Sequence, residues 1–271
     1  NRIKDWCTAP MISIHIKNQT PFLSKNTTSW IQCLPKNTII QTNNGPQIIS
    51  ELINKPTTII KDGQPFKTDG FFETGYRDIY KIITIEGYEL ECTSDHLIQT
   101  SDFDLKLWQE AIKLKPGQEI CLNNHKNLSW SGDGDYDDGY VLGWLLGDGT
   151  FHNKNKSSPV LYVYEDQEIM VILSKILNES NIIHRKDGAL TIGGKQLLRL
   201  CEKFNFYNKS EVYNLQFNSS HFCKGLISGM IDTDGSINEQ RKNIHIYQSN
   251  YEILQILQSI LLRLGVKSSI Y

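Results

Sequence analysis

The sequence predicts a mixed fold, with a mainly β first half followed by an α+β second half that contains two similar units. The chain has 271 residues, which is enough for two domains. Its first half contains short β-branched runs bounded by Asp-Gly and Glu-Gly turn signals, at residues 57–63 and 79–87. Its second half contains two near-identical apolar segments, VLGWLLGDG at residues 141–149 and ISGMIDTDG at residues 227–235. We infer that the second half is built from two copies of one structural unit.

Each of the two segments predicts a buried helix that ends in an aspartate, Asp148 in the first and Asp234 in the second. The glycine after each aspartate suits the left-handed turn that often stops a helix. A helix C-terminus carries partial negative charge, and it disfavours a carboxylate by about 0.3–1 kcal/mol. A positive group is therefore expected beside these aspartates.

The spacing of the glycines favours close packing of the two helices. Glycines lie four residues apart in both, at Gly143 and Gly147 and at Gly225 and Gly229. Residues four apart share one helix face, so each helix has a stripe without side-chain bulk. Packing along these stripes brings the two terminal aspartates together, where they repel unless they share a proton or bind a divalent cation.

Strand and helix patterns follow both segments in the same order. After the first come a strand, a helix, a hairpin and a second helix, at residues 160–164, 169–177, 182–192 and 197–201. After the second come a strand at residues 244–247 and a helix at residues 253–264. The second copy has no counterpart of the hairpin and closing helix, so we expect the chain to be a fragment of a longer polypeptide.

The paired segments resemble the two motifs of LAGLIDADG homing endonucleases. The resemblance implies two pseudo-symmetric αββαββα halves in one monomer, which cut double-stranded DNA with Mg²⁺ or Mn²⁺ held by Asp148 and Asp234. The second motif keeps a further acidic residue of the family pattern, Asp232, whereas the first has Leu146 there. The aspartate at the last acidic position is present in both motifs, which argues for an active nuclease.

The resemblance also implies that the strands lie in the DNA major groove, the groove that distinguishes all four base pairs. The candidate DNA-contacting residues are His152, Lys154, Lys156, Arg185, Lys186, Arg241 and Lys242. Any one of them alone is more often a solvated surface charge. The formal net charge of −2 gives little support, because nucleic-acid binders are usually more basic.

Lys209 is a further candidate catalytic residue. It stands upstream of the second motif, where many members of the family have a lysine followed by Ile-Pro; here Ser210 and Glu211 follow it. The resemblance places this lysine near the scissile phosphate, where a cation polarises the attacking water or stabilises developing charge. The alternative is an exposed loop lysine.

Two segments of the first half resemble the splicing blocks of inteins. Residues 33–45, CLPKNTIIQTNNG, resemble the N-terminal block, and residues 87–96, GYELECTSDH, resemble the second block with its Thr-x-x-His signature. The Cys33 thiolate is a strong nucleophile, and it would convert the Gln32–Cys33 peptide bond into a thioester. Thr93 would orient that bond and His96 would protonate its nitrogen, without a cofactor.

The two resemblances together predict the organisation of the whole chain. Residues 1–32 would be the tail of the host protein (the N-extein) or in part a cloning-derived leader, and residues 33–130 an all-β, horseshoe-like Hint splicing domain. Residues 131–138 would be an acidic linker, and residues 139–271 the endonuclease with its second half incomplete. The C-terminal splicing block is not found, so we expect that this chain alone does not complete splicing.

Other classes of site and location are disfavoured. Residues 133–144 do not form a regular EF-hand, because position twelve is Trp144 rather than glutamate. Six cysteines without a CxxC pair argue against zinc and redox motifs. No signal peptide or apolar run of about 18 residues is present, so we expect an intracellular protein, cytoplasmic or following its host, with no membrane partner.

Two alternative functions remain. An RNA-binding LAGLIDADG intron maturase would explain residues 139–271 but would leave Cys33, Thr93 and His96 without a role. An intein with an inactive endonuclease is disfavoured because both motif aspartates are present. The leading hypothesis is a bifunctional intein whose partners are the flanking exteins and double-stranded DNA.

Overall fold

The computed structural model describes residues 11–14, 22–25, 33–102, 105–152, 158–164, 173 and 182–271. The chain divides into two compact units. The first comprises Asn1–Pro35, Thr74–Tyr80 and Glu91–Cys121, and the second Lys36–Glu73, Lys81–Leu90 and Leu122–Tyr271.

These units do not coincide with the predicted domains. Much of the predicted splicing domain clusters with the second half, and its packing explains why. Gly45 lies directly against the indole of Trp130, and the Gln258 side chain donates to the Glu86 carbonyl at 2.7 Å. The boundary predicted near residue 130 is therefore not a boundary between compact units.

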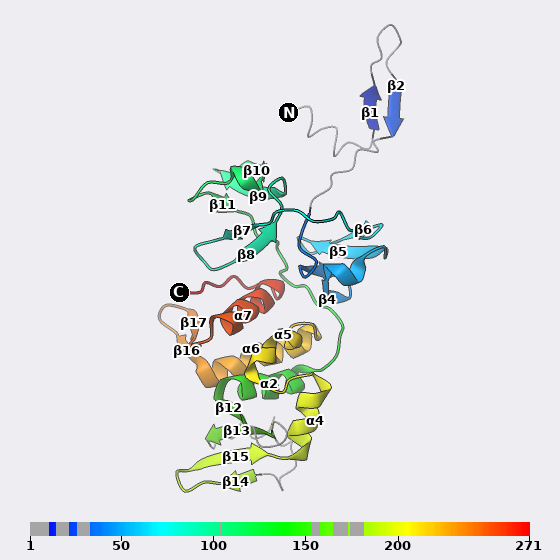
Figure 1. Ribbon diagram of the computed structural model, residues 1–271. Coiled ribbons are helices and arrows are strands. Elements are labelled where there is room, and N and C mark those ends of the chain that lie inside the picture. Colours follow the sequence, from blue (N-terminus) through cyan, green and yellow to red (C-terminus); the bar gives the residue numbers. More distant parts are fainter. Residues whose placement is uncertain are drawn as a thin grey trace. The chain divides into compact units, whose positions relative to one another are not determined.

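The first unit contains a three-stranded antiparallel sheet (Figure 1). Its strands β9 (Leu97–Asp102), β10 (Leu105–Glu110) and β11 (Glu119–Ile120) are ordered β10-β9-β11, and a short 3₁₀ helix η2 (Ala111–Lys113) follows β10. Nearer the N-terminus, β1 (Met11–Ile14) pairs with β2 (Phe22–Lys25).

The second unit begins with a four-stranded antiparallel sheet. It is ordered β4 (Gly45–Ile48), β3 (Ile39–Thr42), β5 (Thr57–Lys61) and β6 (Gln64–Thr68), and a 3₁₀ helix η1 (Ile49–Leu52) follows β4. Asp62 and Gly63 form the two-residue turn between β5 and β6, both with positive φ (49° and 73°), as such hairpins require.

A two-stranded sheet, β7 (Tyr80–Ile83) with β8 (Glu89–Cys92), completes the predicted β region. The strands expected near residues 57–60 and 79–85 are thus present. The described residues between 33 and 121 contain strands and 3₁₀ helices but no α-helix, in agreement with the predicted all-β class.

Two long helices pack against each other in the second unit, as the glycine spacing predicts: α2 (Tyr136–Asp148) and α6 (Ser220–Asp234) (Figure 1). A Cβ atom on Gly143 would strike the backbone of Leu226, and one on Gly229 would strike the Tyr140 carbonyl. Gly139, which the sequence argument did not use, extends the same stripe by one turn. The two helix backbones therefore lie so close together that only glycine fits at these positions.

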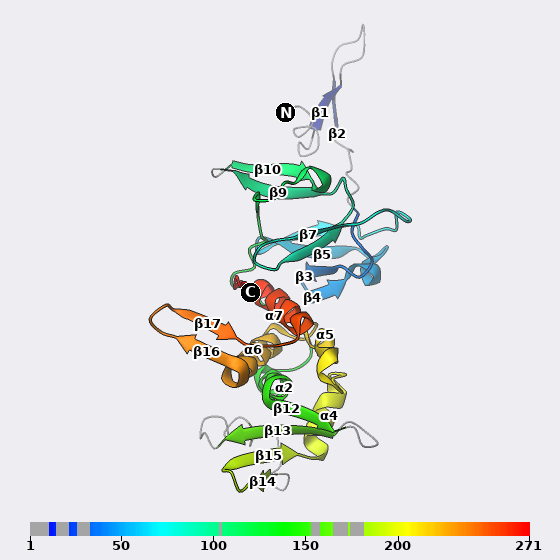
Figure 2. The same cartoon turned by 60° about the vertical axis from the view of Figure 1, so that its left-hand side comes forward.

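A four-stranded antiparallel sheet covers α2 on one side (Figure 2). Its order is β12 (Gly149–His152), β13 (Ser158–Tyr164), β15 (Ala189–Gly193) and β14 (Ile182–His184), and α4 (Lys195–Lys203) follows. The predicted strand, hairpin and second helix of the first copy are confirmed. The helix predicted at residues 169–177 lies outside the described residues except for Leu173, which is buried.

The second copy consists of α6, the hairpin β16 (Gly235–Asn238) and β17 (Asn243–Ile246), and α7 (Tyr251–Arg263). Both predicted elements after the second motif are therefore present. A 3₁₀ turn η4 (Lys209–Glu211) and the short helix α5 (Val212–Leu215) connect the first copy to the second. Buried apolar residues of both copies form one hydrophobic cluster.

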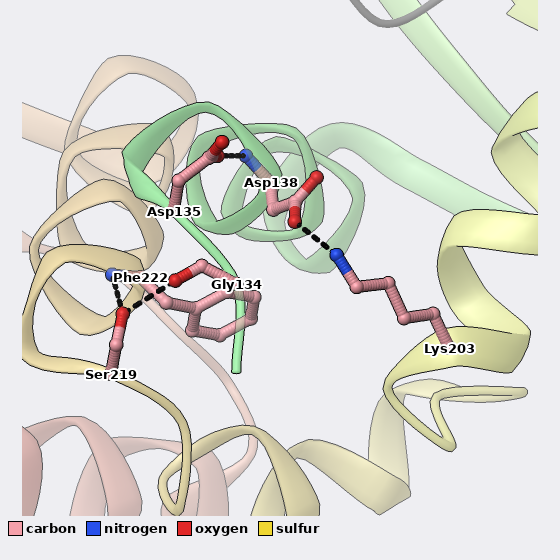
Figure 3. A network of polar contacts seen from close by, with 6 residues as sticks. All are labelled: Gly134, Asp135, Asp138, Lys203, Ser219 and Phe222. Atoms are coloured by element: carbon pink, nitrogen blue, oxygen red, sulfur yellow. Dashed lines mark hydrogen bonds and ion pairs between the residues drawn. The ribbon is translucent and has the colours of Figure 1, made fainter. Parts of the chain in front are cut away.

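The predicted linker at residues 131–138 is partly helical, which corrects the sequence assignment (Figure 3). Asp135 caps α2, its carboxylate accepting from the Asp138 N–H at 2.9 Å, and Asp138 pairs with Lys203 at 2.7 Å. Ser219 caps α6 and also donates to the Gly134 carbonyl at 2.6 Å. The acidic residues belong to a helix N-terminus, which favours negative charge, and not to a free linker.

Among the residues that the structure describes, no helix is long and apolar enough to cross a membrane.

Candidate functional site

Asp148 and Asp234 end the paired helices and lie at the same end of the pair. The two helices are in register there, since a methyl group on Gly147 would lie 3.4 Å from the Asp234 Cγ. Burial raises the pKa of Asp234, the nearby charge of Asp148 raises that pKa further, and Lys209 opposes both. The structure thus brings the two predicted carboxylates into electrostatic contact.

The glycines after these aspartates do not adopt the predicted left-handed conformation. Gly149 has φ −93° and ψ 167°, and Gly235 has φ −95° and ψ 162°, so both are extended. Each glycine begins a strand directly after its helix. Glycine is needed for another reason, because a Cβ would strike the backbone one turn earlier, at Leu145 and Ile231 respectively.

Lys209 supplies the positive group expected at the helix ends. Its Nζ donates to the carbonyl oxygen of Gly147 at 2.6 Å, and the side chain is half-buried. Burial lowers the pKa of Lys209, whereas Asp234 and Asp148 raise it. Lys209 is therefore part of the aspartate site and is not an exposed loop lysine.

Sequence reasoning missed two side chains that bind the acidic residues. The Gln248 amide donates to Asp234 Oδ2 at 3.3 Å, and the Tyr140 hydroxyl donates to Asp232 Oδ2 at 2.7 Å. Gln248 lies just beyond β17, so only the hairpin geometry brings it to the site. Asp232, the additional acid of the second motif, is thus held by a residue of the opposite helix.

The donor set fits a hard divalent cation that takes part of its coordination from substrate. No cluster of three or more His, Cys, Asp or Glu side chains suited to a metal occurs in the described part of the chain. Mg²⁺ is commonly bound by one or two carboxylates together with waters and phosphate oxygens. Asp148 and Asp234 match that pattern.

The predicted DNA-contacting residues lie in three places. His152 ends β12, Arg185 and Lys186 lie in the β14–β15 turn, Arg241 and Lys242 lie in the β16–β17 turn, and Lys154 and Lys156 are outside the described residues. All five described residues are exposed. The Arg185 guanidinium lies 5.5 Å from the ring centre of Tyr162 on β13 and 3.2 Å from Asp187.

A second group of predicted residues meets in the first unit. The Thr93 N–H donates to the Cys33 carbonyl at 3.2 Å, and the Thr93 hydroxyl donates to the same oxygen at 3.5 Å. The His96 N–H donates to the Thr93 carbonyl at 3.1 Å, which closes the Thr-x-x-His turn. Cys33 is 8% exposed.

The His96 side chain is half-buried beside Cys33. Burial lowers its pKa, while a hydrogen bond to the Cys33 backbone and the charge of Asp95 raise it. Its buried Nδ1 has no hydrogen-bond partner within the described residues.

The predicted role of Thr93 at the Gln32–Cys33 peptide falls partly outside the described residues, because Gln32 is not among them. Within the described residues Thr93 contacts the Cys33 carbonyl, which lies on the C-terminal side of the nucleophile. A further side chain, Thr74, places its Oγ1 3.2 Å from the Cys33 Sγ, and no sequence pattern indicates this contact.

Residues 222–271 match the family model of the LAGLIDADG-like domain. This range holds the second motif with Asp234 and the helix α7. The match confirms the predicted LAGLIDADG resemblance for the second copy.

Several curated proteins are similar to this chain. The ATP-dependent DNA helicase Hel308 of Methanocaldococcus jannaschii is 28% identical over 263 residues, which cover 88% of this chain and 21% of that protein. The ribonucleoside-diphosphate reductase NrdEB subunit alpha of Bacillus subtilis is 27% identical over 229 residues, covering 72% and 20%. A DNA polymerase of M. jannaschii is 29% identical over 109 residues, covering 39% and 6%.

The chain thus spans about a fifth of the length of the first two relatives. Among solved structures, variants of the homing endonuclease I-DmoI are similar at 20% identity and a TM-score of 0.37, covering 50% of this chain and 77% of that one.

Proposed function

We propose that this chain combines a metal-dependent, site-specific DNA endonuclease with an autocatalytic protein-splicing centre. The observation that carries the nuclease is the convergence of Asp148, Asp234 and Lys209 at one end of the glycine-packed helices. The LAGLIDADG-like match over the second copy supports the same activity.

The arrangement of charges suits phosphodiester hydrolysis. Two carboxylates held in mutual repulsion favour a bound cation, and Mg²⁺ or Mn²⁺ there would neutralise phosphate charge and make a bound water more acidic. Lys209, fixed by the Gly147 carbonyl, presents an ammonium to the charge that develops on the phosphate. Gln248 holds Asp234 in one orientation.

The exposed face of the β12–β15 sheet is the proposed DNA-reading surface. One face of β13 is buried on the core at Leu161 and Val163, so Tyr162 and Tyr164 point the other way. Arg185 stacks over Tyr162 on this outer face, where it can reach a base edge or a phosphate. An antiparallel ribbon of this kind fits the major groove.

The relatives support a transferable element. A helicase, a reductase and a polymerase share no activity that would require this segment, yet similar sequence occurs in all three. In each it occupies about a fifth of the protein or less. An intein inserted into different hosts accounts for this distribution.

The chemistry at Cys33 follows from its surroundings. The Sγ adds to the Gln32 carbonyl carbon, the bond from that carbon to the Cys33 nitrogen breaks, and the thiol proton ends on the new amine. We assign the transfer of this proton to His96, whose backbone N–H donates to the Thr93 carbonyl within the same group of residues. Thr93 anchors Cys33 by its carbonyl while the bond on its other side is exchanged.

The nuclease is tested with a plasmid library that carries the host gene from which the intein coding sequence, beginning at the Cys33 codon, has been removed, so that the host gene is joined. The complete open reading frame is expressed and incubated with the library. We expect one long site to be cut on both strands with Mg²⁺ or Mn²⁺ and no cutting with EDTA. Cleavage that persists in EDTA, or no cleavage of the joined gene with any divalent metal, would contradict the proposal that this protein is a metal-dependent nuclease.

The splicing centre is tested by adding a small thiol to the same protein. We expect release of an N-terminal fragment that ends at Gln32, because the thiol exchanges with the thioester. Cys33→Ala should prevent release, and His96→Ala should slow it strongly. Equal release from Cys33→Ala would show that no thioester forms at this residue.

A further inference from the structure

The Cys33 thiol has a hydroxyl partner that comes from a distant part of the sequence. Thr74 Oγ1 lies 3.2 Å from Cys33 Sγ, and 41 residues separate the two positions. Both residues belong to the first compact unit. We propose that Thr74 is a positioning residue for the Cys33 nucleophile, an inference that rests on the splicing centre proposed above.

Cys33 is held at two points. Thr93 binds its carbonyl oxygen through both the main-chain N–H and the hydroxyl, at 3.2 and 3.5 Å. Thr74 binds its sulfur. Fixing the main chain and the sulfur together selects one side-chain rotamer, and a nucleophile held in one orientation reacts faster than a freely rotating one.

The Thr74 hydroxyl also affects the charge on the sulfur. A threonine hydroxyl both donates and accepts, and it rotates to suit its partner. It can therefore accept from the neutral thiol and donate to the thiolate. A hydrogen bond donated to a charged sulfur favours the charged form, which is the form that attacks a carbonyl.

The chain around Thr74 includes a glycine in an unusual conformation. Gly75, the next residue, has φ +91°, a conformation that residues with a side chain rarely adopt, and a Cβ there would meet nothing within 4 Å. The glycine is therefore required by its own backbone conformation and not by crowding. This conformation directly follows Thr74, whose hydroxyl lies beside the sulfur.

The test compares Thr74→Val, which keeps the shape but removes the hydroxyl, with Thr74→Ser, which keeps the hydroxyl. Two quantities are measured on the complete open reading frame. One is the rate of thiol-dependent release of the fragment ending at Gln32. The other is the rate of iodoacetamide alkylation of Cys33 at one fixed pH, followed on the peptide that contains Cys33 by mass spectrometry.

We expect Thr74→Val to slow both release and alkylation by about tenfold, since the sulfur is no longer held and the thiolate loses a hydrogen-bond donor. Thr74→Ser should restore both values. Thr57→Val is the matched control, because the Thr57 hydroxyl donates instead to the Lys55 carbonyl, and both quantities should stay at the unmodified value.

An unchanged alkylation rate in Thr74→Val, or a serine variant as impaired as the valine variant, would overturn the role of Thr74. If release still requires Cys33 in that case, the proposed splicing centre stands without Thr74. Conversely, release from Cys33→Ala would contradict the splicing centre itself, while the alkylation rates of the Thr74 variants would still report on the contact between Thr74 and the thiol.

Discussion

At the scale of single residues, the candidate nuclease site holds charges where a folded chain would not otherwise place them. Asp148 and Asp234 both end helices, where partial negative charge already accumulates, and the charge of Asp148 raises the pKa of Asp234. Lys209 offsets part of this cost from a 3₁₀ turn. Groups held against their electrostatic preference in this way are typical of functional sites.

Replacing Lys209 by alanine should slow cleavage of a cognate duplex by at least about tenfold, or about 1.4 kcal/mol of transition-state stabilisation. The reason is that its ammonium is already fixed beside both aspartates. Single-turnover kinetics and a separate binding assay measure rate and affinity. Lys224→Ala is the control. Lys224 is an exposed residue of α6 and lies roughly 15 Å before Asp234 along the helix. A normal rate with weakened binding would make Lys209 a DNA contact only.

The raised pKa of Asp234 predicts a pH-dependent stability difference. Since its folded pKa lies above the unfolded value, the ionised form is disfavoured in the metal-free fold, and protonation relieves this as pH falls through the raised pKa. Asp234→Asn should therefore melt at a higher temperature than the unmodified chain at neutral pH in EDTA. The difference in melting temperature between the two proteins should become smaller toward acid pH. An Asp234→Asn protein that melts at a lower temperature, or a difference that does not change with pH, would contradict the repulsion between Asp148 and Asp234.

At the scale of elements, the glycine stripes determine where the two motif aspartates can meet. Gly143 and Gly229 allow α2 and α6 to touch backbone to backbone, and this contact sets the distance between the two helix ends. The caps at the opposite ends, Asp135 and Ser219, fix where each helix begins (Figure 3). The caps fix where the two helices begin and the glycines fix how closely they pack, and together these contacts align the carboxylates of the two motif aspartates.

Gly143→Ala tests this packing, because the expected change in stability is opposite to the usual effect of alanine in a helix. Alanine normally stabilises a helix over glycine by about 0.5–1 kcal/mol. Here its Cβ would overlap backbone atoms of Leu226, which cannot move aside, so we expect a net loss of about 1–3 kcal/mol in chemical denaturation. Gly193→Ala, where the nearest atoms lie at 3.4 Å or more, should change little. A more stable Gly143→Ala protein would show that the helices are not packed this closely.

Sequence patterns predicted the elements well and the contacts between distant residues poorly. Periodicity and the repeat located both helices and their aspartates, because those signals are local. The side chains of Gln248 and Thr74 reach their partners only through tertiary structure, and nothing in their own neighbourhoods marks them. The acidic run before α2 is compatible with a linker when the sequence is considered alone, but negative charge is also typical of a helix N-terminus, which is where the structure places it.

At the scale of the whole molecule, the two candidate centres lie in different compact units. Cys33, Thr93 and His96 belong to the first, whereas both motif aspartates and Lys209 belong to the second. The proposed splicing chemistry needs neither a metal nor DNA, and the proposed nuclease needs no cysteine. Each centre should therefore tolerate substitutions that inactivate the other.

The most direct measurement is double-strand cleavage of the joined host gene in Mg²⁺ by the unmodified protein, Asp148→Asn and Asp234→Asn, with duplex binding measured in parallel. Cys33→Ala serves as the control, which should cut normally. We expect either aspartate variant to bind the duplex with little change but to lose double-strand cleavage, because each carboxylate would hold part of one metal-dependent site. Undiminished double-strand cleavage by Asp234→Asn would contradict the proposed nuclease site.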